Sequence, residues 1–292
     1  MRLATLNLDG TETACVQFGR GFLPLAALNA RTGTDWPTDL LALIESGRLD
    51  DLGRWFSRDG EGSAGKLEGE VLTGDALRFA PLYRRPRKIW GIGLNYREHA
   101  ADLDERAPTG EPASFMKPDT CIIGPGEEIL IPRQSEKTTA EAELGLVFGT
   151  RCRDVPRGEW LSVLAGFTAV IDCTAEDILR RNPRNLTQAK SFDTFFSFGP
   201  VLVTPDEITN VLKLRVRTVV NDRARAADVV ANMTFPPAFL VEYHTAIWTA
   251  LPGDVLSTGT PGAAAVSGGD VVECRITGFP ALRNPVRDLK IT

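Results

Sequence analysis

Two glutamates, Glu141 and Glu143, stand two residues apart in the stretch TTAEAELGLVFG, and an apolar run follows them directly. The stretch is typical of a β-strand, in which residues i and i+2 point to the same face. Burying two neighbouring carboxylates without a cation is costly, because like charges repel and each charge loses its hydration. The pattern therefore raises the question of which cation holds them.

A third carboxylate, Asp172, ends the apolar run LAGFTAVI, where a buried strand is expected to give way to a helix. Three carboxylates suit a hard divalent ion such as Mg²⁺, Mn²⁺ or Ca²⁺ better than zinc, and they leave positions open for water or substrate. The spacing leaves one alternative open. The two glutamates would then lie on a solvated strand face, and Asp172 would cap the following helix.

A possible proton-transfer pair lies in GLNYREHAADL, where His99 and Asp102 are three residues apart. On a helical turn they share a face, so the carboxylate can orient the imidazole as a general base toward water. The alternative is a surface histidine on a polar helix. The second of the two histidines, His244, stands in an apolar helical pattern and is interpreted as a packing residue.

Two further stretches have residue types suited to binding an anion. Lys190, in QAKSFDTFFSFGP, can form a plain ion pair or support an anionic substrate and its developing enolate. The stretch GDVLSTGTPG brings backbone N–H groups and a hydroxyl to a tight turn after a strand. No G-K-[ST] follows, so it is not a phosphate loop. A plain turn between strands is the alternative.

These residues must be positioned by many short strands separated by glycine and proline. Helices do not alternate regularly with the strands, which indicates an α+β, β-rich fold and not a doubly wound sheet. Two domains are expected, a small N-terminal one at 1–72 and a larger one at 73–292.

Composition excludes several classes of function. The chain has 292 residues, 43% apolar and 24% charged, and a net charge of −5 without a basic block, so a nucleic-acid partner is not expected. The apolar runs are too short to cross a bilayer, and MRLATLNLDG lacks the form of a signal peptide. A cytoplasmic protein is expected. Its five cysteines form no CxxC pair, which favours reduced thiols over a zinc site.

Taken together, the motifs resemble the fumarylacetoacetate hydrolase family over Lys88 to Val286. In chain order they are GLNYREHAADL, SFMKPDT, the E-x-E of AEAELGLVFG, DCTAEDI, AKSFDTF, GP-x-LVT, GDVLSTGTPG and GDVVEC-x-ITG. The resemblance implies that family's catalytic domain, a mixed β-sandwich or roll, after a small N-terminal α+β domain.

The resemblance also implies a site. Mg²⁺ or Mn²⁺ would bind a 2-oxo acid there, and a His with an acidic partner would activate water. The residues carried over are Glu141, Glu143 and Asp172 as metal ligands, His99, Asp102 and Lys190 as catalytic groups, and Lys190, Gly259 and Thr260 at the substrate.

The expected reaction is metal-dependent hydrolysis of a C–C bond in an acylpyruvate-type 1,3-diketo acid. The alternative is decarboxylation or isomerisation of a 2-oxo (di)acid on the same metal–enolate site. A third hypothesis is a non-catalytic binding protein on this fold. The partner is a small-molecule 2-oxo acid, and a homodimer without membrane contact is expected.

Three positions depart from the family pattern. Asp102 stands where many members have Glu, which shortens its reach to His99. Glu176 replaces an arginine and thereby reverses a charge near the expected metal. Ala226, in VNDRARA, stands where Gln is common, so a hydrogen bond to substrate is expected to be absent.

Overall fold

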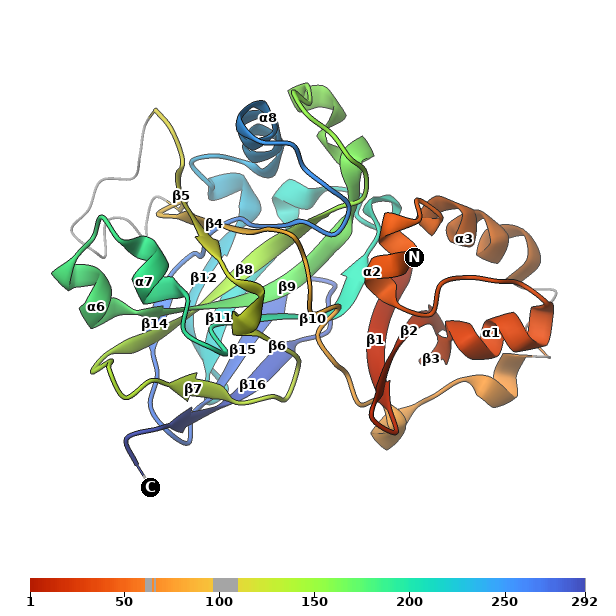
Figure 1. The fold of residues 1–292 in the computed structure, drawn as a ribbon, viewed down its shortest axis with the longest axis horizontal. Helices are drawn as coiled ribbons and strands as arrows, with labels where there is room; N and C mark the ends of the chain where they lie inside the picture. Colours follow the sequence, from red (N-terminus) through yellow and green to blue (C-terminus); the bar gives the residue numbers. More distant parts are fainter. Residues whose placement is uncertain (61–64, 66, 97–109, 292) are drawn as a thin grey trace.

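Two β-sheets with helices at their margins form the computed structural model, which describes residues 1–60, 65, 67–96 and 110–291 (Figure 1). The main path of the larger sheet is, in spatial order, β3 (Gly21–Pro24), β2 (Thr11–Phe18), β1 (Arg2–Leu8), β10 (Phe196–Val203), β9 (Leu164–Ala175), β8 (Thr138–Phe148), β13 (Val255–Ser257), β4 (Ile89–Gly93) and β5 (Ala113–Lys117). Two short strands pair with it at the side: β14 (Ala263–Ala265) with β8, and β6 (Ile122–Ile123) with β10.

The smaller sheet has five strands and packs against the centre of the larger one. Its order is β12 (Arg223–Val229), β11 (Arg215–Val220), β15 (Val271–Ile276), β16 (Leu282–Asp288) and β7 (Ile129–Ile131). Strands β11 and β15 contact β8, and β15 and β16 contact β9.

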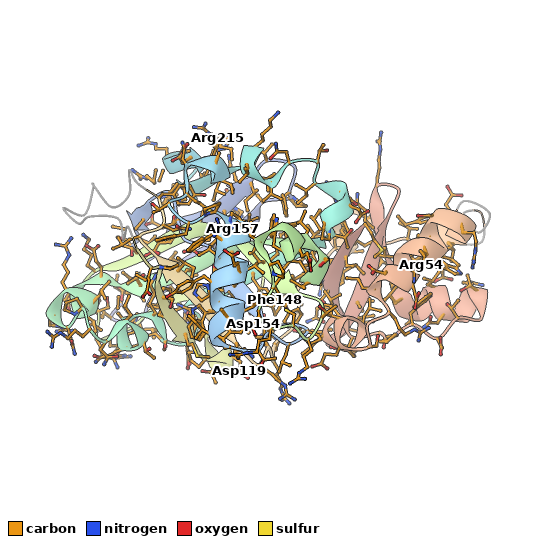
Figure 2. The ribbon with its side chains drawn as sticks, turned by 90° about the horizontal axis from the view of Figure 1, so that it is seen from above. Arg54, Asp119, Phe148, Asp154, Arg157 and Arg215 are labelled. Atoms are coloured by element: carbon orange, nitrogen blue, oxygen red, sulfur yellow. The ribbon has the colours of Figure 1, made fainter. Side chains whose placement is uncertain are left out.

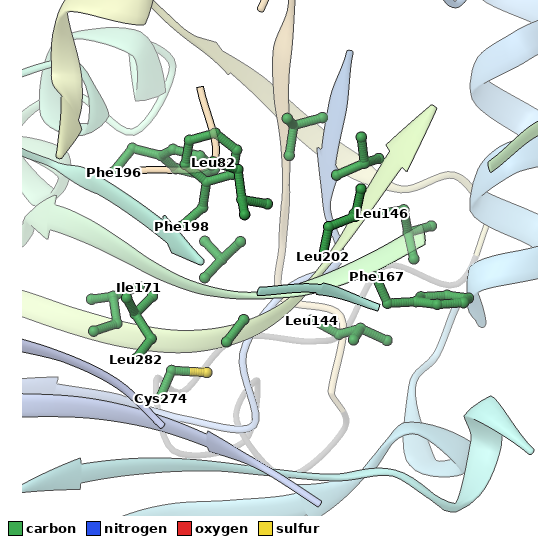
Figure 3. Packing of buried hydrophobic residues seen from close by; sticks show 14 of the residues in the cluster. Leu82, Leu144, Leu146, Phe167, Ile171, Phe196, Phe198, Leu202, Cys274 and Leu282 are labelled. Carbon is green, nitrogen blue, oxygen red and sulfur yellow. The ribbon is translucent and has the colours of Figure 1, made fainter. Parts of the chain in front are cut away.

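The core lies on both sides of β8 and β9. All twelve residues of β9 and ten of the eleven residues of β8 are buried, which explains why these strands read as nearly continuous apolar runs. Leu144, Leu146 and Phe167 pack on these strands, with Phe198 of β10 and Cys274 of β15 nearby (Figure 3). Two long strands buried on both faces give the site a rigid base.

The helices lie around the sheets. They are α1 (Leu25–Thr32), α2 (Leu40–Glu45), α3 (Leu49–Trp55), α6 (Glu176–Arg181), α7 (Leu186–Lys190) and α8 (Pro237–Ile247). Shorter helical turns are η1 (Phe56–Gly60), η2 (Glu68–Glu70), η3 (Gly74–Ala76), η4 (Asp119–Cys121), η5 (Arg157–Val163), η6 (Pro205–Glu207), η7 (Val211–Lys213) and η8 (Val230–Asn232). Exposed arginines such as Arg54 and Arg215 project from the outside (Figure 2). Among the described helices, none has both the length and the apolarity needed to span a bilayer.

The α+β, β-rich fold predicted from the sequence is confirmed. The N-terminal strands do not form a separate sheet, because β1 pairs with β10 and so continues the large sheet. The division into domains at 1–72 and 73–292 stays a prediction.

Candidate metal and substrate site

The three predicted carboxylates come together on one face of the central strands. Glu141 of β8 is the direct antiparallel partner of Asp172 of β9, and Glu143 lies two residues farther along β8. One oxygen from each of the three lies within 4.8 Å of the others. Asp172 is far from the two glutamates in sequence, but the register of the β8–β9 pair places the carboxylates side by side, because side chains of directly opposed residues lie close together.

The alternative reading of these residues is wrong. Asp172 is 1% exposed and Glu143 is 1% exposed, so this is not a solvated strand face. Asp172 does not cap the helix either, because β9 continues to Ala175 and α6 starts at Glu176 with no side-chain cap. Strand β9 extends three residues beyond Asp172, where the change from strand to helix was expected, so the aspartate is buried within the strand.

The two oxygens of Glu143 differ in their hydrogen bonds to the described residues. Its Oε2 accepts hydrogen bonds from Ser257 Oγ at 2.6 Å and from the Gly259 backbone N–H at 2.8 Å. Its Oε1 is buried and has no hydrogen-bond partner among the residues the structure describes. A buried carboxylate oxygen without a hydrogen-bond partner is rare in folded proteins, and a bound cation would explain it.

Two lysines form ion pairs with the other two carboxylates, those of Glu141 and Asp172. Lys190 Nζ lies 2.7 Å from Asp172 Oδ2 and 3.0 Å from Glu141 Oε2, and Lys117 Nζ lies 2.5 Å from Asp172 Oδ1. Thr174 Oγ1 donates to the remaining Glu141 oxygen at 2.7 Å. In this structure, therefore, the cations beside the carboxylates are ammonium groups.

Lys117 was not recognised from the sequence, although its stretch SFMKPDT carries part of the family resemblance. A lysine that closes an apolar strand just before proline is the signal that could have identified it. It ends β5, at the edge of the sheet, and lies 55 residues before Asp172. Only the folded sheet brings the two together.

Burial and mutual repulsion change the ionisation of the cluster. Burial raises the pKa of Glu143 to about 8, and the negative charge of Asp172 adds to this, although Lys190 opposes it. Burial by itself lowers the pKa of Lys190, but the carboxylates of Asp172 and Glu141 raise it above its ordinary value. Lys190 is therefore an ammonium ion, and Glu143 keeps its proton to a higher pH than an ordinary glutamate does.

A pH dependence of stability follows for the protein without metal. Between about pH 4.5 and pH 8 the folded state holds a proton on Glu143 that the unfolded state has lost, so the free energy of unfolding falls as the pH rises. Thermal melts in EDTA across this range should show the fall, and Glu143→Gln should reduce it. Parallel curves for the two proteins would contradict the assignment.

The TGTPG turn packs closely against the site. Gly259 has φ +91°, and a Cβ there would meet Asn95 Cβ at 2.8 Å, so only glycine fits. The buried Thr260 hydroxyl accepts from Gly262 N at 3.2 Å and donates to Gly262 O at 3.1 Å. The structure thus places Gly259 beside the triad, while the Thr260 hydroxyl bonds within the turn.

The predicted pair His99 and Asp102 lies outside the described residues. The preceding Asn95 is fully buried, where its amide donates to Phe235 O at 3.0 Å and to Thr258 O at 2.7 Å. It also accepts from the Phe235 N–H at 2.8 Å. These bonds connect Asn95 to Thr258 of the TGTPG turn and to Phe235.

The departures at positions 176 and 226 have local explanations. The Glu176 carboxylate pairs with Lys137 at 2.8 Å and with Arg180 at 2.6 Å, so its charge is compensated beside α6. Ala226 lies against the turn, since a Cβ at Gly262 would meet Ala226 Cβ at 2.5 Å. A small side chain at this position fits the close packing of β12 on the turn.

His244 is confirmed as a packing residue. It is fully buried in α8, with Nδ1 at 2.8 Å from Leu240 O and its ring close to Trp90 and Trp248. Burial lowers its pKa, which keeps it neutral.

The donor set fits a hard divalent cation. It offers carboxylate oxygens within a span that an ion of the size of Mg²⁺ or Mn²⁺ can bridge, and one of them, Glu143 Oε1, has no hydrogen-bond partner in the part of the chain that is described. Lys190 bonds to one oxygen of Asp172 and one of Glu141, so a cation that used those two oxygens would have to displace its ammonium group.

Comparison with known proteins connects the chain to relatives of known activity. The human mitochondrial oxaloacetate tautomerase FAHD2A is 32% identical over 74% of this chain and 71% of its own length. The solved structure of 5-carboxymethyl-2-hydroxymuconate delta-isomerase from Mycobacterium smegmatis is 27% identical, with a TM-score of 0.74 over 99% of both chains. The fumarylacetoacetate hydrolase of Exiguobacterium antarcticum is 25% identical, with a TM-score of 0.81 over 99% of both chains.

These relatives are a tautomerase, an isomerase and a hydrolase, so enzymes with different reactions share this fold. The family model for the fumarylacetoacetate hydrolase C-terminal domain matches residues 88–287, and this range includes the three carboxylates and both lysines. The chain belongs to the fumarylacetoacetate hydrolase family.

Proposed function

We propose that this protein is a divalent-metal-dependent hydrolase that cleaves a C–C bond in an acylpyruvate-type 1,3-diketo acid. The observation that carries the proposal is the buried triad of Glu141, Glu143 and Asp172, with the free Glu143 Oε1 and the Lys190 ammonium beside it. The carboxylates could hold a divalent ion that a 2-oxo acid chelates, and the Lys190 ammonium could bind the negative charge of the same substrate.

The proposed mechanism gives each residue of the site a separate role. Glu141, Glu143 and Asp172 would hold Mg²⁺ or Mn²⁺, which when bound would supply Lewis acidity toward the oxo and carboxylate oxygens of a 2-oxo acid. Lys190 would place its ammonium against the negative charge that develops on the substrate. The Gly259 N–H and Ser257 Oγ orient Glu143 by bonding to its Oε2. Thr260 would lie near the substrate carboxylate, and its hydroxyl would have to leave its bonds to Gly262 to reach it.

His99, oriented by Asp102, is proposed to take a proton from water as the water oxygen bonds to the distal carbonyl carbon. The C–C bond between that carbon and the adjacent CH₂ group then breaks, its electron pair leaves as the enolate of the 2-oxo acid, and His99 returns the proton to the enolate carbon. Replacing His99 with alanine should leave metal binding unchanged and lower hydrolysis by about 10²–10⁴-fold, the usual effect of removing a general base. Calorimetry with Mn²⁺ and a hydrolysis assay on the same preparation test this. Wild-type turnover in His99→Ala would remove the general-base role.

A second candidate reaction keeps the metal and Lys190 but needs no attacking water: decarboxylation or isomerisation of a 2-oxo (di)acid. It is favoured by the 32% identical human relative, an oxaloacetate tautomerase, and by the 27% identical isomerase. It predicts that His99 is less important than Lys190.

One substrate panel distinguishes the two reactions. An acylpyruvate, oxaloacetate and an unsaturated 2-oxo diacid are incubated with Mn²⁺, with Mg²⁺ and with excess EDTA. Loss of the diketo absorbance with release of two acids supports hydrolysis. Release of CO₂, or a change of absorbance without cleavage, supports the second reaction. Equal rates in EDTA would contradict both.

A non-catalytic binding protein is the third hypothesis. The pairing of Glu176 with Lys137 and Arg180, and the proximity of three carboxylates to Lys190, favour an enzyme instead. A cytoplasmic location and a homodimer stay predictions.

A further inference from the structure

Lys117 is a buried charge that the proposed reaction does not use. Its Nζ lies 2.5 Å from Asp172 Oδ1 and 3.3 Å from the Cys173 carbonyl oxygen, and it is 3% exposed. Lys190 holds the other oxygen, Asp172 Oδ2, at 2.7 Å. Both oxygens of Asp172 are therefore bonded to ammonium groups.

The two lysines also share a neighbour. The ring centroid of Phe115 lies 5.8 Å from Lys117 Nζ and 4.7 Å from Lys190 Nζ. Phe115 precedes Lys117 by two residues on β5 and so points to the same face of the sheet. The ammonium groups are thus held by carboxylates and an aromatic face, with little exposure to water.

The charges explain why the site is assembled in this form. One oxygen from each of Glu141, Glu143 and Asp172 lies within 4.8 Å of the others. Within the described part of the chain, Lys117 pairs with Asp172, and Lys190 pairs with Asp172 and Glu141. Without the lysines, buried carboxylates at this spacing would repel one another or take up protons.

We propose that Lys117 is a positioning residue that acts as a resident counter-ion. It keeps Asp172 in place when no metal is bound, and for the same reason it opposes metal binding. This inference rests on the metal site of the proposed function.

The two lysines have different freedom. Lys190 bridges Glu141 and Asp172, so it must withdraw when a metal takes those oxygens, and it can then reach an anionic substrate. Lys117 contacts only one oxygen of Asp172 and is also held by the Cys173 carbonyl. It would therefore stay beside a bound ion, and like charges in a buried site repel.

The direction of the effect separates this role from simple packing. Removing the Lys117 charge should strengthen metal binding while it destabilises the metal-free protein. A lysine that only packed or only oriented Asp172 would weaken metal binding when it was removed.

The test uses the full chain, stripped with chelator, and needs no activity assay. The variants are Lys117→Met, which removes the charge and the hydrogen bond, and Lys117→Gln, which keeps a donor without the charge. Calorimetric titration with Mn²⁺ should give dissociation constants at least about tenfold lower than wild type for both, since a neighbouring like charge has been removed. Thermal melts in EDTA should show lower midpoints, with a larger rise on adding Mn²⁺.

The matched control is Lys88→Met. Lys88 Nζ lies 2.6 Å from the fully buried Asp254 Oδ2, an ion pair of similar geometry outside the triad. This variant should also melt at a lower temperature in EDTA, but its Mn²⁺ affinity should match wild type.

Each outcome decides the inference. Unchanged or weaker Mn²⁺ binding in Lys117→Gln overturns it. If Lys117→Met folds only when Mn²⁺ is present, the metal has replaced the lysine, which supports it; if it folds in neither condition, the Lys117→Gln titration decides. Absence of Mn²⁺ binding to the wild-type protein would instead overturn the proposed function.

Discussion

Replacing Glu143 with glutamine is expected to lower the affinity for Mn²⁺ by about 100-fold or more, equivalent to about 2.7 kcal/mol, and to abolish turnover. The free Oε1 of Glu143 would become part of an amide, which is a far weaker ligand than a carboxylate. The fold should survive, because the raised pKa of Glu143 means that the metal-free protein already accommodates a neutral side chain here. Calorimetry and thermal melts in EDTA measure the two properties separately.

The control for this variant is Glu273→Gln. Glu273 of β15 is also a buried glutamate, but it pairs with Arg275 at 2.6 Å and lies outside the triad. Its replacement should lower stability and leave Mn²⁺ binding unchanged. Equal losses of Mn²⁺ binding in the two variants would indicate a general effect of removing buried carboxylates and not a ligand role.

Replacing Lys190 with methionine is expected to lower turnover by about 10³-fold, comparable to removing a donor that stabilises a developing anion. Metal binding should persist, because Lys190 bonds in this structure to Glu141 and Asp172, the oxygens that the ion would take. Methionine keeps most of the length and volume of the side chain. The measurements are turnover at saturating Mn²⁺ and calorimetry on the stripped protein.

Lys137→Met is the matched control for Lys190. Lys137 also pairs with a carboxylate, that of Glu176 at 2.8 Å, but it is half exposed and lies outside the triad. Turnover of Lys137→Met should stay close to wild type. If Lys190→Met kept turnover within about tenfold of wild type, Lys190 could not be the group that stabilises the developing charge.

The sequence predicted the parts of the site that depend on local geometry. The E-x-E spacing puts Glu141 and Glu143 on one face because side chains alternate along a strand. The apolar run before Asp172 predicts a buried strand, because only burial on both faces favours so few polar residues. The order of the motifs along the chain then indicated the family, and with it the fold.

Contacts between distant residues could not be read in this way. Glu143 is held by Ser257 and Gly259, which follow it by 114 and 116 residues. The N-terminal β1 pairs with β10 in the large sheet, a pairing that no local pattern in either segment specifies. Such pairings depend on how whole strands pack, because any of several registers satisfies the local alternation.

The sequence by itself determined which side chains could chelate a cation, and that Glu141 and Glu143 would point to the same face of a strand. Only the tertiary structure decided that Asp172 would face Glu141 across the β8–β9 pair, and that Lys117 and Lys190 would occupy its two oxygens. The physical reason is that alternation along a strand is set by the backbone of each residue. The partner of a buried charge is set by the register and packing of strands that are far apart in the chain. No single segment of the sequence determines that packing.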